Sequence, residues 1–178
     1  MARNLTTEAV VLKNNRIGDI HKGVILFTKD LGIINAIAHG AYKGKGRLTG
    51  VTDPFSFIDC FLYHDPVRDN YKITDVFCKE QFERIRTELF RYYYGALWAE
   101  LLIKSYGGGE QTETLFALLV PSLHLLNRES KPYVDYVLLQ FLWRFLVIVG
   151  IGSSPDRCGL CGRDIETNKP AYYYEREN

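Results

Sequence analysis

The stretch that decides the fold is Phe-Ser-Phe-Ile-Asp-Cys-Phe-Leu-Tyr, at residues 55–63. Alternate side chains of an extended strand point to opposite faces. Both faces of this strand are apolar, one carrying Ile58, Cys60 and Leu62 and the other Phe55, Phe57, Phe61 and Tyr63. A strand that is apolar on both faces is typical of a closed barrel with another layer packed outside it.

Four further β-rich runs flank this segment and are separated by turn residues. They cover residues 10–12, 24–27, 33–38 and 71–78. Glycines and Asx residues, such as those at 14–18 and 30–32, end the runs as turns do. Five strands in about 75 residues predict a small barrel of the oligonucleotide-binding type. We assign it residues 1–79.

The pattern becomes helical after residue 80. Phe90, Tyr94, Leu97 and Leu101 follow one helical face, and Gly107 to Gly109 end that helix. Further helices are predicted over residues 111–127, where Pro121 must kink or divide the helix, and over 132–149. The last is apolar nearly all round, so we expect it to be the central, buried helix. The fold class is therefore α+β: a five-stranded barrel, a helical domain over residues 80–178, and a cysteine-containing tail from about residue 153.

Composition excludes several classes of protein. The 178 residues are 47% hydrophobic and 24% charged, with a net charge of +1, which excludes a disordered chain. Residues 1–15 lack the apolar core of a secretory leader. The longest apolar stretch, residues 136–151, is interrupted by Gln140 and Arg144 and is too short to span a bilayer. We therefore expect a cytoplasmic protein that does not enter a membrane.

Positive charge is concentrated at the start of the chain. Residues 1–50 contain eight Lys and Arg against three Asp and Glu. The glycine-rich segment 40–47 carries Lys43, Lys45 and Arg47, which can follow a phosphate backbone. We predict these three as DNA contacts, with Arg16, Lys13 and Lys22 next. The alternative is a solvated loop whose charges only aid solubility. A nucleotide-binding P-loop is excluded, because the spacing is one residue short and Gly46 replaces the Ser or Thr.

Cys158 and Cys161 form a Cys-x-x-Cys pair followed by a glycine, which is typical of half a zinc knuckle. A structural zinc site needs four ligands, and no second pair follows before Asn178. Unpaired structural thiols and a redox pair remain alternatives, although the strand–helix setting of a thioredoxin-like motif is absent. We expect Cys60 and Cys78 to be small buried residues. No nucleophile–base arrangement stands out, so we expect a protein that is not an enzyme.

Several segments together resemble the RecO family of bacterial DNA repair and recombination mediators. They are residues 8–12 with Gly18, 24–32, 38–41 with the basic residues after them, 53–55, 94–96, 100–102, 150–151 and 158–162. The likeness covers essentially the whole chain. This sequence departs from the family because it ends before a second cysteine pair and the usual C-terminal helices.

The resemblance implies a non-enzymatic, nucleoid-associated protein with an N-terminal oligonucleotide-binding barrel and, in many members, a four-cysteine zinc site. It implies binding of single- and double-stranded DNA, annealing of complementary strands, and help in loading the recombinase onto strands coated by single-strand-binding protein. The implied partners are RecR and the acidic C-terminal tail of single-strand-binding protein. For the tail we expect an apolar groove in the helical half, with Arg91 and Arg144 on its rim among Arg84 and Arg86.

Three alternatives stay open at this point. The helical arginines could instead pair with Glu83, Glu88 and Glu100 on the helix surface. The whole protein could be an interaction adaptor whose barrel binds peptide, which salt-dependent DNA binding would argue against. It could also be a thiol redox protein that uses Cys158 and Cys161, which a depressed cysteine pKa would favour.

Overall fold

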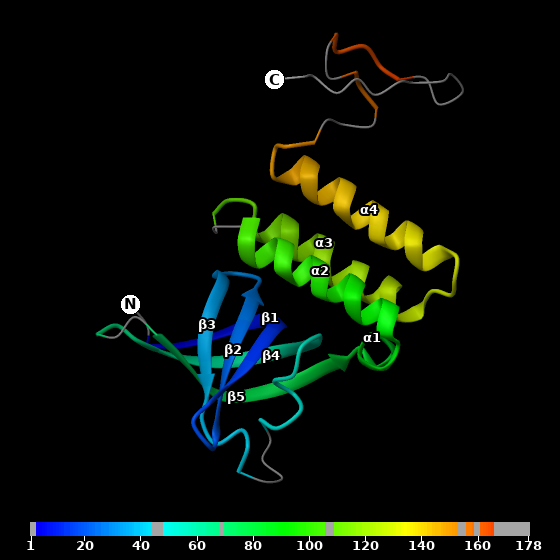
Figure 1. Ribbon diagram of the computed structural model, residues 1–178. Coiled ribbons are helices and arrows are strands. Elements are labelled where there is room, and N and C mark those ends of the chain that lie inside the picture. Colours follow the sequence, from blue (N-terminus) through cyan, green and yellow to red (C-terminus); the bar gives the residue numbers. More distant parts are fainter. Residues whose placement is uncertain are drawn as a thin grey trace.

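A computed structural model describes residues 3–43, 48–67, 70–105, 109–152, 156–158 and 161–165. Within them the chain forms a β-barrel followed by a helical layer (Figure 1). The strands are β1 (Asn4–Ile17), β2 (His21–Thr28), β3 (Gly32–Ala38), β4 (Ser56–Asp65) and β5 (Asn70–Gln81). The helices are α1 (Glu83–Thr87), α2 (Leu89–Ser105), α3 (Thr112–Arg128) and α4 (Tyr133–Ile148).

The five strands close into a barrel in the order β1-β2-β3-β5-β4. All neighbouring pairs are antiparallel except β3 and β5, which run parallel. β1 closes the barrel because it is long enough to pair with β4 through residues 4–10 and with β2 through residues 9–17. The prediction of five strands and closure is confirmed, and both fit the oligonucleotide-binding type of barrel.

The two faces of the barrel strands belong to two separate cores. Val11, Leu26, Ile58 and Cys60 point inside the barrel, where they are fully buried. The neighbouring residues Val10, Leu12 and Phe27 point outward into a second core that the helices complete. The strands are therefore apolar on both faces because a helical layer covers part of the outside.

Phe55 joins the barrel to α2. Its backbone is left-handed, with φ of 63°, a conformation that is uncommon for a bulky residue. Its N–H donates to the carbonyl of Val11 at 2.8 Å, which holds this backbone in place. Its ring packs on Gly95, where an added Cβ would lie 2.9 Å from the ring. Glycine at this position lets the helix approach the ring closely.

The expectation that residues 132–149 form the central, buried helix is wrong. α4 lies at the outer edge of the helical layer, farthest from the barrel (Figure 1). It buries Val137, Phe141 and Phe145 against the other helices. Its outward face leaves Tyr136 66% exposed and Leu139 61% exposed. Although α4 is apolar nearly all round, only one of its sides is buried. Within the described residues, the other helices pack against that side alone.

Pro121 neither divides nor ends α3, which is continuous from Thr112 to Arg128. The proline ring is exposed on the outer side of the helix. A proline removes one backbone donor and leaves the carbonyl four residues earlier without its usual partner. That residue is Ala117, which is also exposed, so water can satisfy its carbonyl. Among the described residues, no helix is long and apolar enough to cross a membrane.

Candidate functional site

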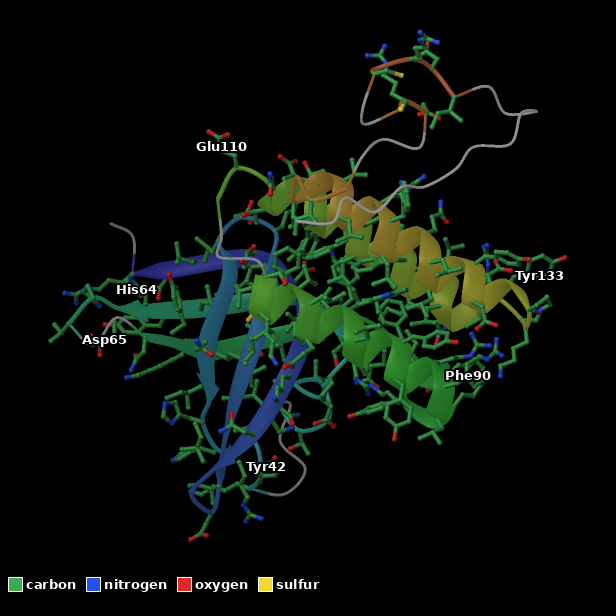
Figure 2. All side chains as sticks on the ribbon, turned by 45° about the horizontal axis from the view of Figure 1, so that its top comes forward. Tyr42, His64, Asp65, Phe90, Glu110 and Tyr133 are labelled. Carbon is green, nitrogen blue, oxygen red and sulfur yellow. The ribbon has the colours of Figure 1, made fainter. Side chains whose placement is uncertain are left out.

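One end of the barrel gathers cations around an exposed tyrosine. Figure 2 shows Tyr42 at the end of the barrel that points away from the helices. Tyr42 is 40% exposed. The Arg16 guanidinium lies 5.3 Å from its centroid and the Lys22 ammonium 5.1 Å. Lys43, the next residue, is exposed to solvent. The structure thus brings together three of the predicted DNA contacts, Arg16, Lys22 and Lys43.

Local hydrogen bonds hold this end of the barrel in shape. The Arg16 Nε and Nη2 donate to the carbonyls of Gly18 and Asp19 at 3.1 and 2.9 Å, across the turn between β1 and β2. The Tyr42 N–H donates to the carbonyl of Ile20 at 3.1 Å. The chain after β3 turns through Gly40, whose φ is 70°. Tyr42 is therefore fixed against the β1–β2 turn by its own backbone.

Lys22 is not available to a phosphate in this structure, which corrects its prediction as a DNA contact. Its side chain is only 2% exposed, and its Nζ donates to Oδ1 of Asp53 at 2.7 Å. The same Oδ1 accepts from the Asn14 amide at 3.0 Å. Lys22 has the strand parity of Val24 and Leu26, which point into the barrel. It therefore closes one end of the barrel interior with a charge that Asp53 balances.

The remaining predicted DNA contacts lie apart or outside the described residues. Lys13 is exposed on β1 and lines a cavity of about 290 Å³ between the barrel and α2, with Glu100 on its other side. Lys45 and Arg47 lie outside the described residues.

Two histidines occupy neighbouring strand ends: His21 begins β2 and His39 follows β3. The rings of His21 and His39 meet edge to face at 4.7 Å. The Nδ1 of His21 accepts the Gly40 N–H at 3.1 Å. Burial lowers the pKa of His39, and the neighbouring His21 and Lys72 lower it further. The lowered pKa favours the neutral form of His39.

Arg91 is buried inside the helical domain, so the prediction that it lies on a groove rim is wrong. It is 1% exposed. Its Nε donates to Oε2 of Glu88 at 2.7 Å, and its Nη2 to the carbonyl of Glu129 at 2.7 Å. Its Nη1 donates to the carbonyl of Leu126. Arg91 thus ties the start of α2 to the end of α3.

Arg84 and Arg86 are also engaged within the protein. Arg84 pairs with Glu88 at 2.7 Å and donates to the carbonyls of Asn127 and Arg128. Arg86 donates to the Ser56 hydroxyl at 2.6 Å and to the carbonyl of Pro54 at 3.0 Å. The alternative of pairing within the helices is confirmed at Glu88, which both Arg84 and Arg91 contact.

A groove does exist in the helical half, and Arg144 lines it. It lies between α3 and α4 and has a volume of about 610 Å³. Its walls are largely apolar, with Leu118, Val147 and Trp143 among them. Trp143 is 46% exposed. A mostly apolar groove with one arginine can accept an apolar side chain that lies next to a carboxylate.

Backbone hydrogen bonds flank the two late cysteines, Cys158 and Cys161. Cys158 donates its N–H to the carbonyl of Arg163 at 2.8 Å, and Gly162 donates to the carbonyl of Cys158 at 2.9 Å. Cys158 is half-buried and Cys161 is exposed. A tetrahedral zinc site takes four ligands, of which these two cysteines would supply two. No group of three or more His, Cys, Asp or Glu that could hold a metal occurs within the described part of the chain.

Two residues of these surfaces were missed by reasoning from the sequence. Tyr42 stands next to Lys43 in the basic segment, and an aromatic residue among cations is a known signal for nucleic-acid binding. Trp143 precedes Arg144. No sequence pattern marked Trp143, because an apolar helix does not show which of its faces is left uncovered.

Comparisons with known proteins cover both halves of the chain. The family model described as "Recombination protein O N terminal" matches residues 1–82, and "Recombination protein O C terminal" matches residues 86–177. The chain is similar to the DNA repair protein RecO of Desulfatibacillum aliphaticivorans, with 32% identity over 91% of this chain. It is 31% identical to that of Alkaliphilus metalliredigens over 89% of this chain, and 27% identical to that of Clostridium novyi over 93%. In each case it covers 63% of the relative's length.

Proposed function

Because the chain belongs to the RecO family, we propose that it binds DNA in recombinational repair, through the end of the barrel that carries Tyr42. The observation that carries this proposal is the exposed Tyr42 with the Arg16 guanidinium 5.3 Å from its ring centroid. Lys43, the next residue in the sequence, is also exposed. Lys45 and Arg47 follow Lys43 at alternate positions in the sequence. Exposed cations neutralise phosphates and release counterions, and an aromatic ring offers a surface on which a base can stack.

The proposed activity needs no catalytic group. An annealing protein has to neutralise phosphates on two complementary strands, so that base pairing can bring them together. We propose that the chain binds single- and double-stranded DNA, anneals strands, and takes part in loading the recombinase onto strands coated by single-strand-binding protein. RecR is proposed as a partner on the family likeness alone. Co-purification with RecR would test it.

A salt series tests the proposed DNA surface. Each single-strand phosphate contact adds about −0.7 to the slope of log K against log salt. Converting Lys43, Lys45 and Arg47 to alanine should therefore make the slope shallower by roughly 2, equally for unrelated sequences. The matched control converts Lys104, Arg128 and Lys131, three exposed cations of the helical domain. An unchanged slope in the first variant, or an equal change in the control, would contradict the assignment.

The groove between α3 and α4 supports a second, complementary activity. We propose that it holds the acidic, apolar C-terminal tail of single-strand-binding protein, with Arg144 on the tail carboxylates. Trp143 lines the groove while Trp98, the other tryptophan, is fully buried. Tail binding should therefore change the emission of Trp143. Arg144→Glu should weaken the tail at least tenfold, whereas Lys104→Glu on α2 should not.

We also propose that Cys158 and Cys161 form half of a structural zinc site whose other ligands lie outside the described residues. Zinc bound to this chain should be substoichiometric, weak or shared between chains. Metal analysis after gel filtration measures the zinc content per chain. A full equivalent of tightly bound zinc in a monomer would contradict the proposal, and so would a disulfide that persists under reducing conditions.

A further inference from the structure

Tyr42 is held in place by charged groups and by its backbone. The Lys22 ammonium near its ring is fixed by Asp53 at 2.7 Å. The Arg16 guanidinium near its ring is fixed by two carbonyls of the β1–β2 turn. Cations attract the negative face of an aromatic ring. The ring is thus oriented before any ligand arrives, although 40% of the residue faces solvent.

A ligand for this ring has to combine a flat face with nearby negative charge. The exposed part of Tyr42 suits a flat, polarisable group. Arg16, near the ring, and the exposed Lys43, next in the sequence, suit an anion. A nucleotide supplies both, since every base has a π-face and carries a phosphate. In a duplex the faces of the bases are covered by their neighbours. Away from the ends of a duplex, only an unpaired base can therefore stack on Tyr42.

We propose that Tyr42 stacks on an unpaired base and makes this end of the barrel prefer single strands over duplex. This inference rests on the proposed DNA binding and adds the residue that selects the strand type. The cations act on phosphates, which both kinds of DNA carry. Tyr42 acts on the base, which only the single strand offers.

Lys22 acts through Tyr42 and is a positioning residue. Lys22 is too buried to reach a phosphate. Its ammonium lies 5.1 Å from the centroid of the Tyr42 ring and helps to orient that ring. Its loss should weaken single-strand binding without changing the salt slope, and Lys22→Arg should restore part of the affinity. A structural role unconnected with the ring would lower affinity for both kinds of DNA equally.

The experiment compares single-stranded and duplex oligonucleotides of equal length, bound to the full chain across a salt series. Tyr42→Leu should lower single-strand affinity roughly tenfold or more, keep duplex affinity within about twofold, and leave the salt slope unchanged, because no phosphate contact is lost. Tyr42→Phe should retain the affinity of the wild type, since stacking needs no hydroxyl. The matched control is Tyr133→Leu, which removes an exposed tyrosine of α4 and should change neither affinity.

Tyr42→Trp keeps an aromatic ring at the position and covers the case in which Tyr42→Leu does not fold. Single strands should quench the additional tryptophan emission, and duplex should not. Equal losses for the two kinds of DNA in Tyr42→Leu, or equal quenching of Tyr42→Trp by both, would overturn the inference and leave the DNA-binding proposal standing. If the wild-type chain binds neither kind of DNA, both proposals fail.

Discussion

The barrel and the helical domain each contain a predicted ligand-binding cation that proved buried, beside predicted cations that proved exposed. In the barrel, Lys22 is buried beside Asp53 while Arg16 lies on the surface. In the helices, Arg91 is buried beside Glu88 while Arg144 lines an open groove. The two buried cations hold elements of the protein together, and the two exposed ones remain available to a ligand.

This comparison teaches that local charge identifies a region but not the residues that act in it. The alternation of side chains along a strand, or their spacing along a helix, decides which cation reaches solvent. Lys22 follows the inward parity of Val24 and Leu26. Arg91 lies four positions before Gly95 and seven before Trp98, and both of these are buried on α2. The roles of cations can therefore be assigned only after strand parity and helical period have been considered.

The largest expected effect on stability is that of Arg91→Met. The change removes three hydrogen bonds from a buried guanidinium and leaves the carbonyls of Leu126 and Glu129 without this donor. We expect the free energy of unfolding to fall by about 3 kcal/mol. Urea unfolding measures it, with Arg144→Met as the control that should stay within about 0.5 kcal/mol. Similar free energies of unfolding for the two variants would contradict the claim that buried Arg91 stabilises the fold more than exposed Arg144 does.

A smaller effect is expected for Lys22→Met in the barrel. The variant loses the ion pair with Asp53, but the Asp53 side chain is 44% exposed and still accepts from Asn14. Water can therefore reach the abandoned carboxylate, and we expect a loss of about 1 to 2 kcal/mol. The control is Lys43→Met, an exposed cation of the same region. A loss as large as that of Arg91→Met would show that the barrel interior depends on Lys22 more than its contacts indicate.

The smallest effect concerns a carboxylate on the barrel surface. The hydrogen bond from Lys79 is the main cause that lowers the pKa of Glu8 below its ordinary 4.5, with a further contribution from Lys29. A carboxylate whose pKa is lowered in the folded state stabilises the protein at pH values above its ordinary pKa. This stabilisation is lost as the pH falls through the pKa of the folded state. Glu8→Gln should therefore cost less than about 1 kcal/mol at pH 7 and less still at pH 3. Urea unfolding at both pH values measures this, and a cost that grows on acidification would contradict the ion-pair explanation.

Much of the fold was predictable because the alternation of apolar residues is strong in the barrel strands. β1 was expected over residues 10–12, yet it extends to Ile17. Asn14 and Asn15 suggested a turn, but they pair with Val24 and Gly23 of β2. The five-residue helix α1 was missed, because one and a half turns are too short to show a period. The uncovered face of α4 was also missed, since tertiary packing alone decides which side of an apolar helix is buried.

The candidate site was predictable as a region rather than as a set of side chains. The basic segment pointed to the barrel end at which Arg16 and Lys43 lie. Tyr42, whose ring lies near Arg16, was not selected, because a single tyrosine in a loop has many ordinary explanations. The groove in the helical half was expected from the family resemblance, yet Arg91 is turned away from it into the core.

The core shared between the two halves has a consequence for the order of folding during synthesis. The barrel strands emerge from the ribosome first and can close around Val11, Leu26 and Ile58. Their outer face, with Val10 and Phe27, stays exposed to solvent until the helices that cover it have been synthesised. A nascent barrel therefore exposes an aggregation-prone apolar surface for as long as translation of the helices takes. Ribosomal pausing within the helical half would lengthen that interval and should increase aggregation of the newly made chain.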